Sequence, residues 1–199
     1  MLVVGIKSRP VYSGLAIDTH APRHLFALEG EGAMALTDQV AAVGRDFLAT
    51  SEILYVARGA ENHAAALAKH KPFDLWTAPT IPILLYRLKA TLISAKMGTR
   101  FYISGTEGFI GQAMQVAIEN GIDFNSIRTE HRGSMARRVQ CVHCKGVTDN
   151  VTTQPFTCSH CGLTLLVRDH YSRRIAAFQG VNIDAEEPGT APAPEVLFP

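Results

Sequence analysis

The chain has 199 residues, of which 47% are hydrophobic and 19% are charged, and its formal net charge is +1. This composition is typical of a globular protein with one ordinary domain and a small additional one. The near-neutral charge argues against a nucleic-acid-binding protein, because the binding domains of such proteins are usually strongly basic.

Two features argue against a membrane or secreted protein. No run of 18 or more apolar residues occurs, and the apolar stretch at residues 81–86 is stopped by Arg87. Residues 1–7 lack a basic region followed by a long apolar one, so we read no signal peptide there. We therefore expect a cytoplasmic protein with no membrane contact.

Residues 1–50 have the least regular pattern of the chain, and we interpret them as an N-terminal extension of unclear fold. Short apolar runs at residues 3–6 and 24–28 are compatible with strands. A glycine-rich turn follows at residues 29–32, and residues 36–48 are compatible with a helix.

From residue 51 to residue 132 the pattern becomes regular, with short apolar runs alternating with helical spacing. The predicted strands are residues 53–57, 73–76, 100–104 and 126–130, and the predicted helices are residues 62–71, 80–98 and 107–120. This alternation is typical of βαβ units. The sequence thus predicts an α/β domain with a parallel sheet and flanking helices.

The four cysteines of the chain lie within 21 residues, in two CxxC pairs separated by 13 residues. The pairs are Cys141–Cys144 and Cys158–Cys161, and each is followed closely by a glycine. CxxC spacing places two thiolates on one tight turn, and glycine permits the positive φ that lets backbone N–H groups point at sulfur. We therefore predict that Cys141, Cys144, Cys158 and Cys161 bind one metal ion.

The paired spacing in a cytosolic chain favours a metal over unligated cysteines or two disulfides. Zinc is favoured over iron in a rubredoxin-like site, because the gap between the pairs is short. Four cysteines complete a tetrahedron, so we expect a structural zinc ion with His143 and His160 outside its ligand set.

The cysteines define a predicted zinc ribbon at residues 139–180, and a proline-rich acidic stretch at residues 184–199 is predicted to be a disordered tail. Basic residues flank the ribbon in sequence. They include Arg137 and Arg138 before it and Arg173 and Arg174 after it, and we interpret them as a surface for an acidic protein partner.

The turn Ser104-Gly105-Thr106-Glu107-Gly108-Phe109, with Ala113-Met114 and Ile127–Glu130 after it, resembles the nicotinamide-binding domain of ferredoxin-reductase-like flavoproteins. The resemblance covers roughly residues 50–132 and implies a nucleotide edge at Ser104, Gly105, Thr106 and Gly108. The chain departs from that family in this turn. The family has a Cys and a Pro where this chain has Ser104 and Thr106, and Glu107 places a carboxylate at a helix N-terminus. We expect the fold to be a degenerate nucleotide domain that does not bind NAD(P)H.

The sequence shows no persuasive catalytic constellation, so we predict no catalytic residues. The stretch from Ser104 through the four cysteines to Arg168 resembles the small subunit of the bacterial haem-dependent dimethylamine (secondary-amine) monooxygenases. The resemblance implies a non-catalytic subunit of an NAD(P)H-dependent complex, whose partners are a haem oxygenase subunit and a flavin and iron–sulfur reductase subunit. The alternatives are a nucleic-acid-binding zinc ribbon and a residual NAD(P)-binding reductase component.

Overall fold

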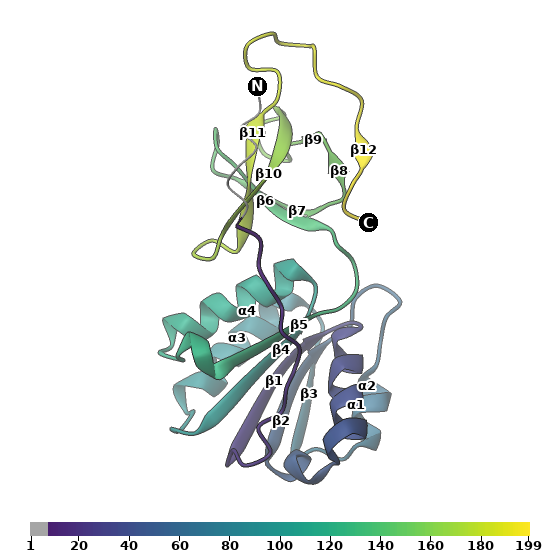
Figure 1. Ribbon diagram of the computed structural model, residues 1–199, viewed down its shortest axis with the longest axis vertical. Coiled ribbons are helices and arrows are strands. Elements are labelled where there is room, and N and C mark those ends of the chain that lie inside the picture. Colours follow the sequence, from purple (N-terminus) through teal and green to yellow (C-terminus); the bar gives the residue numbers. More distant parts are fainter. Residues whose placement is uncertain (1–7) are drawn as a thin grey trace. The chain divides into compact units, whose positions relative to one another are not determined.

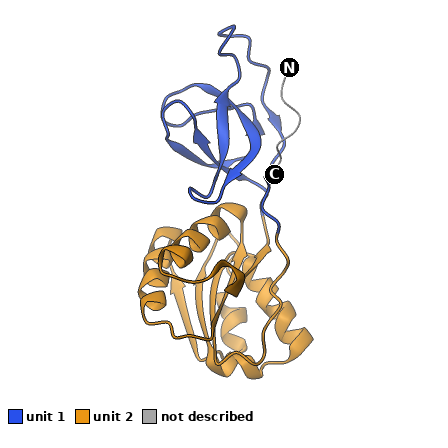
Figure 2. Ribbon diagram, turned by 60° about the vertical axis from the view of Figure 1, so that its left-hand side comes forward, with its two compact units in different colours: residues 1–11, 134–199 blue, residues 12–133 orange. Residues whose placement is uncertain are grey.

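A computed structural model describes residues 8–199, so the strand expected at residues 3–6 lies outside the described residues (Figure 1). The chain forms two compact units (Figure 2). We call residues 12–133 the α/β unit, and residues 8–11 with residues 134–199 the C-terminal unit.

The α/β unit is built on a five-stranded parallel sheet with the strand order β3-β2-β1-β4-β5. The strands are β1 (Arg23–Glu29), β2 (Ser51–Val56), β3 (Asp74–Ala78), β4 (Thr99–Gly105) and β5 (Ile127–His131). The three central strands are almost continuously apolar and buried, because helices cover both faces of the sheet.

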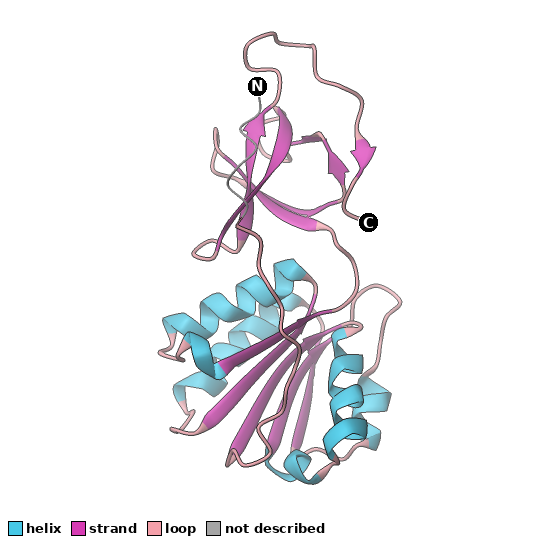
Figure 3. Cartoon of the chain, in the orientation of Figure 1, coloured by secondary structure: helices cyan, strands magenta, loops and turns pink. Residues whose placement is uncertain are grey.

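Helices cover both faces of this sheet (Figure 3). On one side lie α1 (Gly32–Val43) and α2 (Ala64–Lys69), and on the other lie α3 (Ile81–Ile93) and α4 (Glu107–Glu119). Strand β1 shows how its side chains alternate between the two cores: Leu25 and Ala27 pack with α3 and α4, whereas Phe26 and Leu28 pack with α1. Short 3-10 helices at Asp46–Thr50 and Phe124–Ser126 precede β2 and β5.

The α/β unit begins earlier than the boundary at residue 51 that we expected. Strand β1 pairs with both β2 and β4, so the segment interpreted as an extension supplies the central strand of the sheet. The physical reason is that parallel pairing joins segments far apart in sequence, and β1 has no neighbouring βαβ pattern on its N-terminal side to reveal it.

The C-terminal unit is built mainly of strands. They are β6 (Arg137–Cys141), β7 (Val147–Val151), β8 (Thr153–Gln154), β9 (Phe156–Thr157), β10 (Thr164–Ser172), β11 (Ala177–Asn182) and β12 (Glu195–Val196). One sheet has the order β7-β6-β11-β10-β9, and β8 pairs with β12. Pairing of β6 with β11 is parallel, and the other pairs are antiparallel.

The end of the chain is ordered against this unit, which differs from the tail expected at residues 184–199. The backbone N–H of Phe198 donates to the carbonyl of Thr152 at 2.9 Å, and the Phe198 side chain is 9% exposed. The centre of its ring lies 4.1 Å from the Arg137 guanidinium, which lies at the same distance from the centre of the Phe178 ring. The Phe198 side chain and the pairing of β12 with β8 therefore anchor a segment whose composition predicts disorder.

The fold class expected from the sequence is confirmed: a parallel α/β sheet with flanking helices, and a small C-terminal unit with a four-cysteine cluster compatible with a zinc ribbon. In the described part of the chain, no helix has the length and apolar character needed to cross a bilayer.

Candidate functional site

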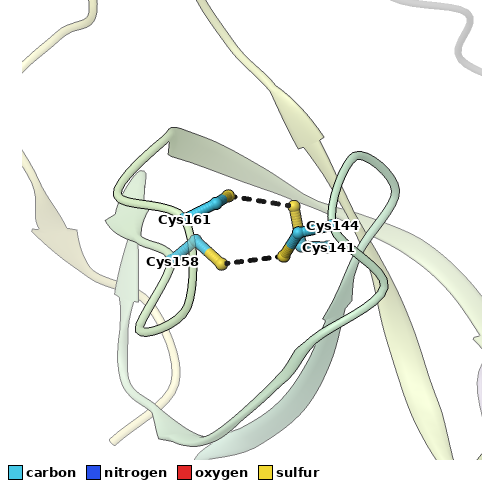
Figure 4. A group of neighbouring side chains, drawn as sticks. All are labelled: Cys141, Cys144, Cys158 and Cys161. Atoms are coloured by element: carbon cyan, nitrogen blue, oxygen red, sulfur yellow. Dashed lines mark hydrogen bonds between the residues drawn. The ribbon is translucent and has the colours of Figure 1, made fainter.

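The four cysteines lie on two turns of the C-terminal unit that face each other (Figure 4). The Sγ atoms of Cys141 and Cys161 are 3.8 Å apart, and those of Cys144 and Cys158 are also 3.8 Å apart. All four sulfur atoms lie within 4.8 Å of one another. Among the described residues, this is the one group of three or more His, Cys, Asp or Glu side chains close enough to hold a metal ion.

The sulfur positions fit a tetrahedral metal ion. A metal–sulfur distance of about 2.3 Å gives an edge of about 3.8 Å between the sulfurs of a regular tetrahedron. Cys141 and Cys158 are buried, and Cys144 and Cys161 are half-buried. The four thiolates fill such a coordination shell, so a metal ion here would have a structural role.

Hydrogen bonds favour the thiolate at Cys158 and Cys144. Burial opposes ionisation of Cys158, but backbone hydrogen bonds from Cys161 and His160, with contacts to the sulfurs of Cys161 and Cys144, lower the pKa of the thiol to about 6. The contacts among the four sulfurs raise the pKa of Cys161 to about 12. In the other turn, the N–H of Gly146 donates to the Sγ of Cys144 at 3.4 Å. Metal ligation requires the thiolate, so both contacts favour metal binding.

The glycines that follow the two CxxC pairs have different roles, which the sequence pattern did not distinguish. Gly162 has a φ of 76°, as expected, but the equivalent position in the first turn is Lys145, with a φ of 63°. Gly146 instead allows the His160 ring to approach the backbone closely, because a Cβ at position 146 would lie 2.4 Å from that ring. The His160 Nε2 lies 2.9 Å from the carbonyl of Val147, so His160 bridges the two turns rather than binding metal.

The carboxyl edge of the α/β sheet is the second place that sequence analysis indicated. Strand order reverses between β1 and β4, and in open α/β sheets ligands bind at such a switch point. Here the two turns touch: a Cβ on Gly32 of α1 would lie 2.2 Å from the carbonyl oxygen of Ser104 at the end of β4. The start of α1 therefore lies directly against the end of β4.

Glu29, at the end of β1, occupies the N-terminus of α4. Its Oε2 accepts hydrogen bonds from the backbone N–H and the Oγ1 of Thr106, at 2.9 and 2.7 Å. Its Oε1 accepts from Arg58 at 2.7 Å, and the Glu29 side chain is 1% exposed. An internal carboxylate thus takes the position at which a helix N-terminus binds a phosphate. Sequence analysis missed Glu29 because it assigned residues 29–32 to a turn outside the sheet.

The predicted nucleotide-edge residues make contacts inside the α/β unit. The Ser104 Oγ donates to the carbonyl of Glu130 at 2.8 Å, and Thr106 is held by Glu29. A Cβ on Gly105 would lie 2.8 Å from the Cβ of Glu29, whereas Gly108 is half-buried in the first turn of α4. The Glu107 carboxylate lies in the first turn of α4, as expected, and accepts from the hydroxyl of Tyr12 at 3.1 Å.

The basic residues around the cysteines do not form one exposed surface. Arg137 is 7% exposed and pairs with Asp169 at 3.0 Å, so it belongs to the core of the C-terminal unit. Arg138 pairs with Asp149 and donates to the carbonyl of Ile175, in the turn that also carries the exposed Arg173 and Arg174. The sequence-based prediction that Arg138 lies near that turn is therefore correct, but the prediction that Arg137 belongs to the same exposed surface is wrong, because the Arg137 side chain is buried.

Comparison with known families shows which family the chain belongs to. Residues 4–127 match the family described as dimethylamine monooxygenase subunit DmmA-like, N-terminal domain, and residues 138–181 match the corresponding C-terminal domain. The chain belongs to this DmmA-like family. The resemblance inferred from the sequence is thereby confirmed, over both units.

A curated relative is the heme-dependent oxidative N-demethylase delta subunit of Ectopseudomonas mendocina (strain ymp). It is 32% identical over 152 residues, which cover 73% of this DmmA-like chain and 87% of the relative.

Two solved structures show weaker similarity. The flavohem-like FAD/NAD-binding domain of nitric oxide dioxygenase from Vibrio cholerae O1 biovar El Tor has a TM-score of 0.45 and 14% identity, covering 62% of this chain and 56% of that one. The Amycolatopsis cytochrome P450 reductase GcoB has a TM-score of 0.41 and 12% identity, covering 58% and 38%. At these TM-scores the likeness supports no conclusion about ligands, and the description of the fold depends on the strand order given above.

Proposed function

We propose that this chain is an accessory, non-catalytic subunit of a haem-dependent secondary-amine monooxygenase, and that it assists assembly or docking of the haem and reductase subunits. Membership of the DmmA-like family and the 32% identical delta subunit support the place in such a complex. In the proposed complex, the partners carry the haem, flavin and iron–sulfur centres, and electrons come from NAD(P)H through the reductase subunit.

The position of Glu29 is the observation that carries the non-catalytic part of the proposal. A buried carboxylate at the N-terminus of α4 disfavours a phosphate group there, beside the switch point between β1 and β4. The α/β unit then serves as a scaffold with a filled nucleotide edge. In the C-terminal unit, we propose that zinc is bound by Cys141, Cys144, Cys158 and Cys161 and stabilises the fold.

Two measurements test the proposal. Affinity-tagged chain, co-expressed with the other subunits encoded by the same organism, should capture a haem-containing and a flavin-containing subunit. The isolated chain should consume no oxygen with dimethylamine and NADH. Turnover by the isolated chain, or quenching of NADH fluorescence by micromolar chain, would instead favour the residual reductase, and salt-dependent DNA binding would favour the nucleic-acid-binding ribbon.

A further inference from the structure

Helix α3 has two apolar faces, and one of them is exposed. Leu84, Leu88 and Leu92 are at most 3% exposed and pack in the core of the α/β unit. On the opposite face, the exposed fractions are 45% for Ile83, 79% for Tyr86, 72% for Ile93 and 100% for Met97. We call Ile83, Tyr86, Ala90, Ile93 and Met97 the α3 stripe.

The spacing of the α3 stripe distinguishes it from scattered exposed side chains, which are common on protein surfaces. Its members follow at intervals of three or four residues, which is the repeat of one helix face, and Met97 continues the series in the turn after the helix. Helix α1 gives a contrast, since its two large exposed apolar residues, Met34 and Val43, are nine positions apart. A continuous apolar stripe on a folded surface indicates an interaction site.

Charge along this segment has one sign. Residues 81–100 contain no Asp or Glu, whereas Arg87 and Lys89 fall on opposite borders of the stripe at about 100° per residue. The Arg87 guanidinium lies 5.8 Å from the centre of the Trp76 ring, which helps to hold it beside the helix. A matching surface must therefore be apolar at its centre and acidic at its rim.

The same charges argue against a second copy of this chain as the occupant. Two α3 stripes face to face would bring Arg87 and Lys89 of both copies together, and like charges across an interface are unfavourable. The buried leucines fix the helix before binding, so a partner would order little chain on docking. Tyr86 adds a large aromatic side chain of the kind that contributes most to binding energy.

We propose that the α3 stripe is the surface through which this chain docks onto another subunit of the complex, one that presents an apolar groove bordered by Asp and Glu side chains. This inference rests on the proposed function, because that function supplies the partner.

The test compares two pairs of surface substitutions in the full chain. Tyr86→Ser with Ile93→Ser removes the centre of the stripe, and Met34→Ser with Val43→Ser is the matched control on α1. Each tagged form is co-expressed with the haem and reductase subunits, and captured subunits are quantified at low and moderate salt. We expect the stripe variant to capture at least tenfold less than the parent, and the control to capture as much as the parent.

A second variant excludes misfolding as the cause. Lys89→Glu with Arg87→Glu keeps the apolar residues and should weaken capture most at low salt, where the lost attraction is least screened. Equal capture by parent and stripe variant would overturn the inference while leaving the proposed function intact. If Arg138→Glu with Arg173→Glu lost capture while the stripe variant kept it, the inference about the α3 stripe would also be overturned, and the proposed function would stand. If the unsubstituted chain formed a dimer that the stripe substitutions dissociate, the inference would be overturned as well. If the unsubstituted chain captured no subunit, both the inference and the proposed function would be overturned.

Discussion

The imidazole of His160 lies on the backbone of Gly146, so close that a Cβ at that position would be 2.4 Å from the ring. The two residues belong to different cysteine turns, and the ring also reaches the carbonyl of Val147 at 2.9 Å. This contact joins the turns independently of any metal. It gives His160 and Gly146 a specific role that CxxC spacing alone does not reveal.

Substitution of Gly146 by Ala should therefore destabilise the C-terminal unit, because the added methyl group displaces the His160 ring. We expect a loss of about 1–3 kcal/mol in the free energy of unfolding, typical of overpacking at a tight contact. In a His160→Ala background the same substitution should cost much less, since the clashing ring is absent. Urea unfolding of the four forms gives this coupling, and additive costs would show that the two residues do not act together.

The metal prediction follows from the sulfur geometry. The purified chain should contain one zinc ion per molecule by elemental analysis, and stoichiometric iron without zinc would contradict this. Cys158→Ala should abolish metal binding and make residues 134–199 sensitive to protease, since metal binding contributes folding free energy on the order of 10 kcal/mol in small metal domains. Residues 12–133 should stay resistant, because their core contains none of the four ligands.

Much of the fold could be predicted from local patterns. The CxxC pairs identified the cysteine cluster, and the alternation after residue 51 identified strands β2 to β5 with their helices. Strand β1 was assigned only as an isolated strand, because its partners β2 and β4 lie 22 residues or more farther along the chain. The role of Glu29 depends on those pairings, and the role of Arg137 depends on its contacts with Asp169, Phe178 and Phe198, so no local pattern could indicate either.

A buried histidine predicts a pH dependence for the α/β unit. His24 is 0% exposed, lies among the rings of Phe26, Phe47 and Tyr102, and has no hydrogen-bond partner on either ring nitrogen. Burial lowers its pKa below 6.5, so the unfolded chain binds the proton more readily than the folded chain. Stability should therefore fall as the pH drops below 6.5, by at most about 1.4 kcal/mol per pH unit.

His24→Phe is the matched variant, because a ring of similar size replaces an unpaired polar one. It should raise the free energy of unfolding by about 1 kcal/mol near pH 7 and reduce the dependence between pH 7 and pH 5. Thermal unfolding at several pH values measures both effects. A variant that retains the full pH dependence would assign it to other groups.

Asp169 connects two arginines in the C-terminal unit, Arg9 at 2.6 Å and the buried Arg137 at 3.0 Å. Asp169→Asn should cost about 1–3 kcal/mol, because the buried Arg137 loses the charged acceptor at position 169. Arg9→Ala is the control and should cost about 1 kcal/mol or less, since Arg9 is exposed.

The pH range of this effect follows from the pKa of Asp169. Burial acts to raise that pKa, but hydrogen bonds from Arg9 and Arg137 lower it overall below 3.8. The contribution of the ion pair is therefore complete above pH 3.8 and disappears as the pH falls through the lowered pKa. Parent and Asp169→Asn should differ by a constant amount at neutral pH and converge in strong acid. A difference that disappears already between pH 7 and pH 5 would contradict this assignment.

The last prediction concerns the carboxylate at the N-terminus of α4. Glu29→Ala removes the acceptor for the Thr106 N–H and the carboxylate that pairs with Arg58, so a small cationic hollow replaces the carboxylate. We expect a loss of about 1–3 kcal/mol in the absence of anions, because the Thr106 N–H loses its acceptor and the partly exposed Arg58 loses one charged contact. Inorganic phosphate should restore part of it, since a helix N-terminus and an arginine together bind such an anion and binding to the folded state raises stability. The parent should show no comparable stabilisation, and Glu29→Gln should show little, because its amide still fills the space.

The measurement is the midpoint of thermal unfolding at increasing phosphate concentration and constant ionic strength. Equal stabilisation of all three forms by phosphate would mean that Glu29 does not block an anion site, and the filled nucleotide edge would then lose its main support.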